Sequence, residues 1–275
     1  MTPLFVALCI AAGACAFVWI ASLVTKDYSW VDRIWSIVPV VYVWVFAASA
    51  GLGDVRLDVM AALVTLWGAR LTFNFARKGG YTGVEDYRWA ILRARMPGWR
   101  FQVFNFFFIV IYQNAILLLI ALPAFTAWEH RDAPFGPLDA LVAVIFVSLT
   151  IGETVADQQQ WNFQARKKQV TDGGGVPNPR FVQTGLWRFS RHPNFFFEQA
   201  QWWALFFLGA AAAGSVLQWT VLGPFLLTLL FVGSTIFTES ISKSRYPEYA
   251  QYQATTSPII PWPPRSAPPV AVPRS

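Results

Sequence analysis

The sequence predicts an all-α integral membrane protein with seven transmembrane helices, its N-terminus outside and its C-terminus in the cytoplasm. Hydrophobic residues make up 55% of the 275 residues and charged residues 13%, with a mean hydropathy of +0.42. These values do not fit a soluble globular domain. The apolar stretches are continuous and lack the alternating pattern of barrel strands, which favours helices over a β-barrel.

Seven apolar stretches each have about the 20 residues that a helix needs to cross the hydrocarbon core. They lie near residues 3–24, 34–52, 57–76, 102–127, 137–156, 195–213 and 216–238. The first has no basic segment before it and runs directly into the polar residues 25–28. We therefore expect a true span there rather than a secretory signal.

The distribution of Lys and Arg predicts the orientation, because these residues gather on the cytoplasmic side of membrane proteins. They follow the first, third, fifth and seventh stretches, whereas the opposite connections contain only Arg56 and Arg131. This asymmetry also accounts for the net charge of +6, so nucleic-acid binding is a poor explanation for that charge.

We expect residues 1–262 to form a single seven-helix membrane domain, because the longest hydrophilic connections, 77–100 and 158–194, are too short for a second one. Residues 263–275 are Pro-rich and are predicted to be a disordered tail. No internal repeat is evident, which counts against an inverted-repeat transporter. Two histidines without adjacent ligands predict no metal site.

The run GLWRFSRHPNFFFEQAQWW, residues 185–203, is the most informative part of the chain. It places arginines, a histidine, an asparagine and a glutamate where a basic loop enters an apolar segment. Polar groups at that depth are costly unless they bind a ligand or one another. Pro193 suits the first turn of the sixth span, and the N-terminus of that helix is a candidate anion site.

Helical spacing places several of these polar side chains on common faces. Asn194 and Glu198 are four residues apart and Gln201 follows three later, while Glu153 and Asp157 repeat the four-residue spacing at the end of the fifth span. Two such faces either meet across a ligand cavity or hydrogen-bond between helices. The basic cytoplasmic loops favour a phosphate-bearing ligand, although anionic lipid also explains their charge.

These motifs resemble the steroid 5-alpha-reductase (3-oxo-5-alpha-steroid 4-dehydrogenase) family, bacterial branch. The segment from Gly185 to Glu198 carries the specific part of the likeness, Arg-His-Pro-Asn. Further similar segments bring the matched region to most of residues 29–262: SWVDRIW at 29–35, GYTGVEDYRW at 80–89, DQQQWNF at 157–163, YAQY at 249–252 and PIIPW at 258–262.

The resemblance implies a membrane reductase that takes hydride from NADPH and saturates the double bond of a lipophilic enone, such as a 3-oxo-4-ene steroid, giving the 5-alpha-dihydro product. The cofactor chemistry belongs to NADPH, and the protein positions it. The residues that the likeness assigns to cofactor binding are Asp157, Asn162, Arg166, Lys167, Arg188, Arg191, His192, Asn194, Glu198, Arg245 and Tyr249.

Enone reduction also needs a donor beside the ketone oxygen. Relatives use a Gln-Glu pair and a tyrosine, but this chain has Asp32 and Trp67 where the glutamate and tyrosine are expected. Asp32, Glu85 and Tyr87 are the candidate catalytic residues, with Tyr112 an alternative source of the hydroxyl. Glu85 is expected to keep its proton in an apolar site and donate it.

The main rival is an S-adenosylmethionine-dependent membrane methyltransferase of the isoprenylcysteine or phospholipid type, which shares Arg-His-Pro. Such enzymes carry paired glutamates in the last span, whereas Glu239 stands alone here. The non-enzymatic reading is a lipid- or sterol-binding protein with a decayed cofactor site. For the reductase we expect the bacterial inner membrane, a cytoplasmic cofactor site, a steroid-like substrate that enters from the bilayer, contacts with membrane lipids and no obligate protein partner.

Overall fold

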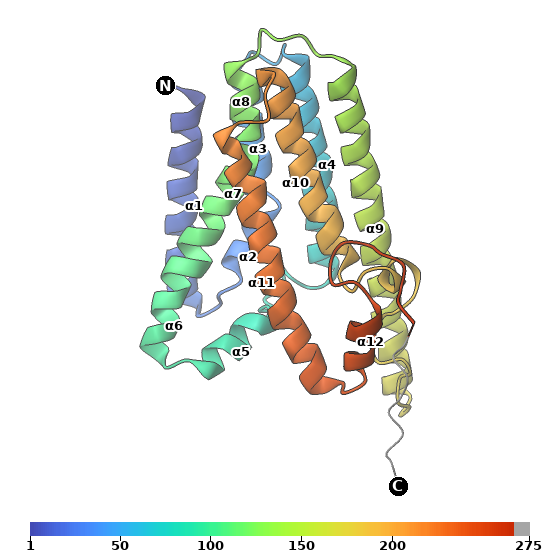
Figure 1. Ribbon diagram of the computed structural model, residues 1–275. Helices are drawn as coiled ribbons and strands as arrows, with labels where there is room; N and C mark the ends of the chain where they lie inside the picture. Colours follow the sequence, from blue (N-terminus) through green and yellow to red (C-terminus); the bar gives the residue numbers. More distant parts are fainter. Residues whose placement is uncertain (267–275) are drawn as a thin grey trace. The chain divides into compact units, whose positions relative to one another are not determined.

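The computed structural model describes residues 1–266; residues 267–275, most of the expected Pro-rich tail, lie outside the described residues. Within the described part the regular structure is helical, with an isolated bridge between Ser190 and Ser257 instead of strands. The chain divides into two compact units, to which helices α9 (Pro137–Asp172), α10 (Pro193–Ala213) and α11 (Leu222–Arg245) each contribute (Figure 1). Unit 1 comprises Met1–Ser148 and Gln201–Thr228, and unit 2 comprises Leu149–Ala200 and Leu229–Ser275.

Unit 1 is built around α3, which packs against α1, α4, α7 and α8. Its elements are α1 (Pro3–Thr25), α2 (Trp30–Trp35), α3 (Val38–Ser49), α4 (Val55–Arg77), α5 (Tyr87–Arg95), α6 (Gly98–Phe104), the π-helix η1 (Asn105–Tyr112), α7 (Gln113–Ala121), α8 (Pro123–Glu129) and the 3-10 turn η3 (Trp219–Val221). Gly68 permits the close packing of α4, because a Cβ there would lie 2.6 Å from the Ser36 carbonyl oxygen.

A buried ion pair joins the loop before α9 to α4 in unit 1. Arg56 donates to both carboxylate oxygens of Asp139, at 2.8 and 2.9 Å, and to the carbonyl oxygens of Ala133 and Pro134. The Gly136 amide also donates to Asp139. These bonds hold the loop before α9 against the first turn of α4.

Unit 2 contains the second half of α9, the 3-10 turn η2 (Gly185–Arg188), the start of α10, the second half of α11 and α12 (Tyr249–Thr255). Pro193 begins α10, as the sequence predicts. Helices α9 and α10 pack closely at Gly152, because a Cβ at this position would lie 2.5 Å from the Phe197 ring. Phe195 and Phe231 pack edge to face and join α10 to α11.

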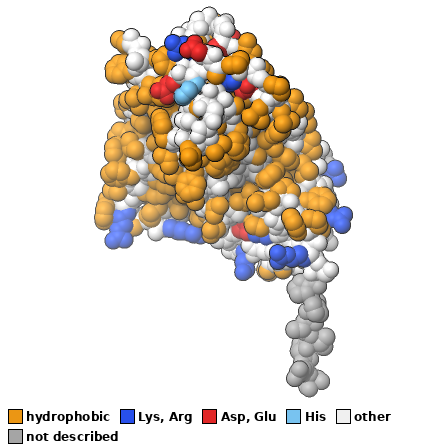
Figure 2. Space-filling view, turned by 45° about the horizontal axis from the view of Figure 1, so that its top comes forward, with side chains coloured by type: hydrophobic (Ala, Val, Ile, Leu, Met, Phe, Trp, Pro, Cys, Tyr) orange, Lys and Arg blue, Asp and Glu red, His pale blue; other side chains and the backbone are white. Residues whose placement is uncertain are grey.

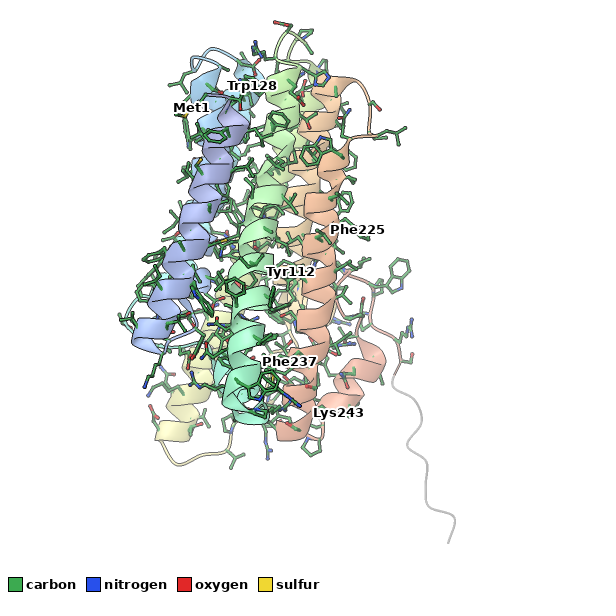
Figure 3. All side chains as sticks on the ribbon, turned by 90° about the vertical axis from the view of Figure 1, so that its left-hand side faces the viewer. Met1, Tyr112, Trp128, Phe225, Phe237 and Lys243 are labelled. Atoms are coloured by element: carbon green, nitrogen blue, oxygen red, sulfur yellow. The ribbon has the colours of Figure 1, made fainter. Side chains whose placement is uncertain are left out.

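Six helical segments within residues 1–266 are long and apolar enough to cross a membrane: Pro3–Thr25, Trp30–Ser49, Val55–Arg77, Gly98–Glu129, Pro137–Asp172 and Trp219–Arg245. The protein is therefore a multi-pass integral membrane protein. Hydrophobic side chains cover most of the face drawn in Figure 2, and Phe225 projects outward from α11 in Figure 3. The remaining expected span, 195–213, is the 21-residue helix α10, whose Asn, Glu and Gln residues make it more polar than the six.

Several predicted spans differ in their limits from the structure, and the seventh, expected at 216–238, runs from Trp219 to Arg245. The second is two helices, α2 and α3, and the fourth runs from Gly98 to Glu129 through η1, with α8 starting at Pro123. The fifth does not end at residue 156 but continues in α9 to Asp172. Hydropathy marks where a helix becomes polar, whereas the helical hydrogen bonds of α9 continue past that point.

Candidate functional site

A buried layer of polar side chains lies within unit 2, and each of three helices contributes a pair with four-residue spacing. The pairs are Glu153 and Asp157 on α9, Asn194 and Glu198 on α10, and Thr235 and Glu239 on α11; all are buried except Asn194, which is half-buried. Glu153 is 2% exposed and Asp157 is 4% exposed. Burying so many polar groups costs free energy unless they meet hydrogen-bond partners or a ligand.

Unit 2 contains buried oxygens without a hydrogen-bond partner among the described residues, and three of them lie on three different helices. They are Asn194 Oδ1, Gln160 Oε1 and Thr235 Oγ1. A buried acceptor left unpaired costs about 1–3 kcal/mol. These atoms, on three different helices, are therefore candidates to bind a donor-bearing ligand.

The segment between α9 and α10 is folded onto α9. Trp187 donates its indole N–H to the Ala156 carbonyl oxygen at 3.1 Å, and the Leu186 amide donates to Gln159 Oε1 at 2.9 Å. Gly185 has φ +64, and a Cβ there would lie 2.5 Å from the Gln159 amide group. The Gly-Leu-Trp part of the motif thus fits tightly against Ala156 and Gln159 of α9.

Arg191 and Glu239 form the centre of a buried hydrogen-bond cluster. Arg191 Nε donates to Glu239 Oε1 at 2.6 Å and Nη2 donates to Oε2 at 3.0 Å. His192 Nε2 lies 3.1 Å from Glu239 Oε1, and Gln253 Nε2 donates to Oε2 at 2.7 Å. Arg191 Nη1 also donates to the carbonyl oxygens of Gln253 and Thr256. We call these four side chains the Arg191 cluster.

The same motif holds the segment after α12, residues 256–262, against unit 2. The Arg191 amide donates to the Ser257 carbonyl oxygen at 2.8 Å, and the Trp262 amide donates to that of Phe189 at 2.9 Å. Ser190 Oγ donates to the Ile259 carbonyl oxygen at 2.6 Å. Ser190 therefore serves a structural role in this arrangement and is not placed as a nucleophile.

The other candidate cofactor residues also fall in unit 2, mostly at its surface. Arg166, Arg188, Arg245 and Asn162 are exposed, and Asn162 Oδ1 accepts from Gln158. Lys167 Nζ donates to the Arg180 carbonyl oxygen and to the Tyr246 hydroxyl, at 2.8 and 2.9 Å. Tyr249 is buried; burial raises its pKa, and it does the same for Tyr252.

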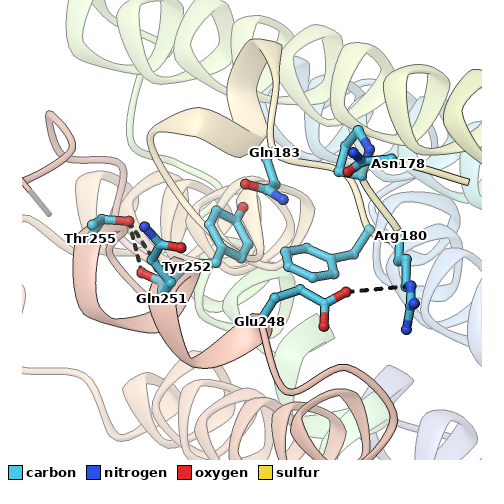
Figure 4. Close-up of a pocket in the computed structure, with 9 residues that line it drawn as sticks. Asn178, Arg180, Gln183, Glu248, Gln251, Tyr252 and Thr255 are labelled. Carbon is cyan, nitrogen blue, oxygen red and sulfur yellow. Dashed lines mark hydrogen bonds and ion pairs between the residues drawn. The ribbon is translucent and has the colours of Figure 1, made fainter. Parts of the chain in front are cut away.

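A polar cavity of about 340 Å³ lies on unit 2, beside the Arg180–Glu248 ion pair of 3.6 Å (Figure 4). Its lining consists of Asn178, Pro179, Arg180, Phe181, Gln183, Glu248, Gln251, Tyr252 and Thr255. None of the predicted cofactor residues lines it. The pocket and the buried polar layer are thus made by different side chains.

The candidate catalytic residues lie in unit 1. Trp89 donates its indole N–H to Asp32 Oδ2 at 2.9 Å. Glu85 accepts from the Tyr28 amide and from two nitrogens of Arg93, at 2.9 and 3.1 Å, so every contact uses it as an acceptor. Glu85 thus forms an ion pair with Arg93 instead of lying in the apolar site that the sequence predicts. Tyr87, 48% exposed, lies at the start of α5.

Several hydrogen-bond partners of residues in unit 1 could not be predicted as partners from the sequence. Trp89 and Gln102 belong to this class: Gln102 Nε2 donates to the buried Tyr28 hydroxyl at 2.9 Å. Arg88 is bonded to Asp86; burial acts to lower its pKa, but the Asp86 carboxylate outweighs burial, and the pKa is raised. Trp89 and Gln102 could not be predicted as partners from spacing, because they lie 57 and 74 residues from Asp32 and Tyr28 in the sequence.

Comparison with known proteins extends over nearly the whole chain. Residues 18–256 match the family described as "Protein of unknown function (DUF1295)". The chain is 39% identical over 251 residues to an uncharacterized protein of Schizosaccharomyces pombe, covering 86% of this chain and 73% of that protein. No solved structure matches. With the family match spanning both helical units, the chain belongs to the DUF1295 family.

Proposed function

We propose that the protein is an NADPH-dependent reductase that saturates the carbon–carbon double bond of a lipophilic enone. A 3-oxo-4-ene steroid reduced to its 5-alpha-dihydro product is the best candidate reaction. The observation that carries the proposal is the buried polar layer of unit 2, in which Asn194 Oδ1 has no partner among the described residues. The resemblance of the surrounding motif to membrane steroid reductases supports it.

The chemistry of this layer fits the nicotinamide end of NADPH. A carboxamide and a ribose offer N–H and O–H donors, and the unpaired oxygens of Asn194, Gln160 and Thr235 are acceptors. Asp157 on α9 and Glu198 on α10 are both buried and would accept hydrogen bonds from the ribose hydroxyls. The exposed Arg166, Arg188 and Arg245 and the half-buried Lys167 suit the phosphates.

Arg191 and His192 would act on the cofactor indirectly. The Arg191 guanidinium donates to Glu239 and to two carbonyl oxygens, which leaves it little capacity for a phosphate. Instead, the Arg191 cluster holds the start of α10 and thereby positions Asn194. We assign both residues a positioning role within the proposed site.

NADPH, when bound, would supply the hydride that forms the new C–H bond at the β-carbon. The π electrons move to the carbonyl oxygen, and a proton from water completes the saturated ketone at the α-carbon. The protein must therefore stabilise negative charge on that oxygen. Asp32, held by Trp89, is the proposed acid of unit 1, and the Glu85–Arg93 pair holds the loop before α5 in place.

The proposed topology has seven spans, with α10 as the seventh, an outside N-terminus and a cytoplasmic C-terminus. The Lys and Arg distribution supports this orientation. It places the basic loops of unit 2 in the compartment that contains NADPH. We propose the bacterial inner membrane as the location.

The deciding experiment is NADPH consumption by the detergent-purified protein with testosterone or progesterone, followed by mass analysis for a gain of two hydrogens. Asn194→Ala should weaken NADPH binding by at least about tenfold, the effect of one lost hydrogen bond. Asn178→Ala, which alters an exposed amide of the same unit, is the matched control. If the protein binds S-adenosylmethionine but not NADPH, the methyltransferase is the better assignment. If it binds neither cofactor but still binds a sterol, the non-enzymatic alternative is favoured.

A further inference from the structure

Trp67 on α4 and Trp202 on α10 form an edge-to-face pair inside unit 1. Their ring centroids are 4.7 Å apart and their planes meet at 78°. Both are among the largest fully buried side chains of the protein, at 0% and 1% exposure. The pair thus lies in the apolar interior of the unit, where water does not satisfy its polar atoms.

Neither indole nitrogen has a hydrogen-bond partner among the described residues, although both nitrogens are buried. An indole N–H is a donor only, and leaving such a group unpaired costs about 1–3 kcal/mol. Some other indoles of unit 1 have partners, since Trp203 donates to Thr228 Oγ1 at 3.1 Å and Trp44 to Thr65 Oγ1 at 2.9 Å, whereas Trp128 Nε1 is also buried without one in the described part of the chain. The Trp67–Trp202 contact differs from these cases in bringing two unpaired donors together.

Ring stacking does not account for both donors. In an edge-to-face pair the edge of one ring meets the face of the other, so at most one N–H can point at a π face. The other donor still lacks an acceptor. The pair consequently has hydrogen-bonding capacity that the described protein groups leave unused.

The backbones that carry the two indoles are held tightly. Next to Trp67, a Cβ at Gly68 would lie 2.6 Å from the Ser36 carbonyl oxygen and from Val40 Cγ2. About two turns beyond Trp202, a Cβ at Gly209 would lie 2.5 Å from the Pro123 carbonyl oxygen. Such close packing limits rearrangement, and donors fixed in advance are the kind that stabilise a bound oxygen.

We infer that the Trp67–Trp202 pair is a binding site for a neutral carbonyl oxygen of a lipophilic ligand. Two neutral donors in an apolar interior suit a ketone, because they stabilise its dipole without introducing a charge that would need a counter-ion. They also favour an oxygen that gains negative charge during reduction. The inference rests on the proposed function for the choice of an enone as the ligand.

The test follows the indole N–H signals by NMR in detergent-solubilised protein labelled with ¹⁵N at its tryptophan side chains. Trp67→Phe and Trp202→Phe each remove one signal and so assign it, and Trp203→Phe assigns the bonded neighbour as the control. The probes are testosterone and androst-4-en-17β-ol, the matched steroid without the 3-oxygen. The signals are measured in wild-type protein, so a poorly folded variant does not affect the titration.

We expect testosterone to move the signal of Trp67, Trp202 or both downfield, with Trp203 unmoved, and to bind about tenfold more tightly than the deoxy steroid, as one hydrogen bond would provide. The inference is overturned if testosterone at its solubility limit moves neither signal, or if both steroids move them equally. Parallel turnover assays separate the two proposals. NADPH oxidation without these shifts would contradict the proposed indole site but not the reductase. The shifts without NADPH binding would contradict the reductase but not the indole site.

Discussion

Replacing Glu239 by Gln should destabilise unit 2 by removing the charge that the buried Arg191 guanidinium faces. Both side chains are nearly buried, at 9% and 8% exposure, so solvent screens their interaction only weakly. In the variant, Arg191 keeps its two carbonyl acceptors but loses its carboxylate. A buried charge without its counter-charge is the main source of the expected cost.

The magnitude follows from the kind of interaction. Breaking a buried ion pair by removing one partner costs about 3–5 kcal/mol. Because Gln keeps one oxygen as an acceptor for Arg191, we expect the lower end, about 3 kcal/mol. At about 2–4 °C per kcal/mol for chains of similar size, the melting temperature should fall by roughly 6–12 °C.

The assay is thermal unfolding in detergent, combined with hydrogen exchange at the Trp262 amide, which donates to the Phe189 carbonyl oxygen. Exchange there should accelerate because the Arg191 cluster holds residues 256–262. The matched control is Asp172→Asn, the same chemical change in the exposed pair Lys168–Asp172. That pair should contribute about 0–1 kcal/mol, as surface ion pairs do.

Equal melting temperatures for Glu239→Gln and Asp172→Asn would refute this reasoning, because burial would then not increase the free energy that an ion pair contributes to stability. If Glu239→Gln lowers stability without faster exchange at the Trp262 amide, the predicted attachment of residues 256–262 would be wrong. The cluster would then stabilise α10 and α11 without holding the segment after α12.

In unit 1, Asp139→Asn should destabilise the protein by about 3 kcal/mol for the same reason, with Asp132→Asn as an exposed control; equal melting curves would contradict it. Gly68→Ala should cost about 1–3 kcal/mol through overpacking against Ser36, whereas Gly233→Ala, with nothing within 4 Å, should be neutral or slightly stabilising, and denaturation of both variants checks the difference. Asp32→Asn should lower enone turnover by at least about a hundredfold if Asp32 is the acid, and unchanged turnover would remove it from the mechanism. Trp89→Phe should lower turnover less, by about tenfold, because it removes one hydrogen bond to Asp32, and an Asp32→Asn/Trp89→Phe double variant should add no further loss.

The helical, membrane-embedded nature of this protein could be predicted from composition, because apolar stretches long enough to span a bilayer are a local property of the chain. The start of α10 at Pro193 and the face shared by Asn194 and Glu198 followed in the same way from local rules. The limits of α9 did not, because its helical hydrogen bonds extend past the apolar segment into residues that hydropathy alone assigns to a loop.

By itself, the sequence determined which residues are polar within apolar surroundings and which of them share a helix face. Only the tertiary structure decided their partners: Arg191 meets Glu239, 48 residues away, and Trp67 meets Trp202 across α4 and α10. It also showed that Arg191, which the resemblance assigns to a cofactor phosphate, binds the Glu239 carboxylate instead. Helical periodicity fixes direction within one helix, whereas the pairing of faces depends on how the helices pack, and that packing is set by many weak contacts with no short-range pattern.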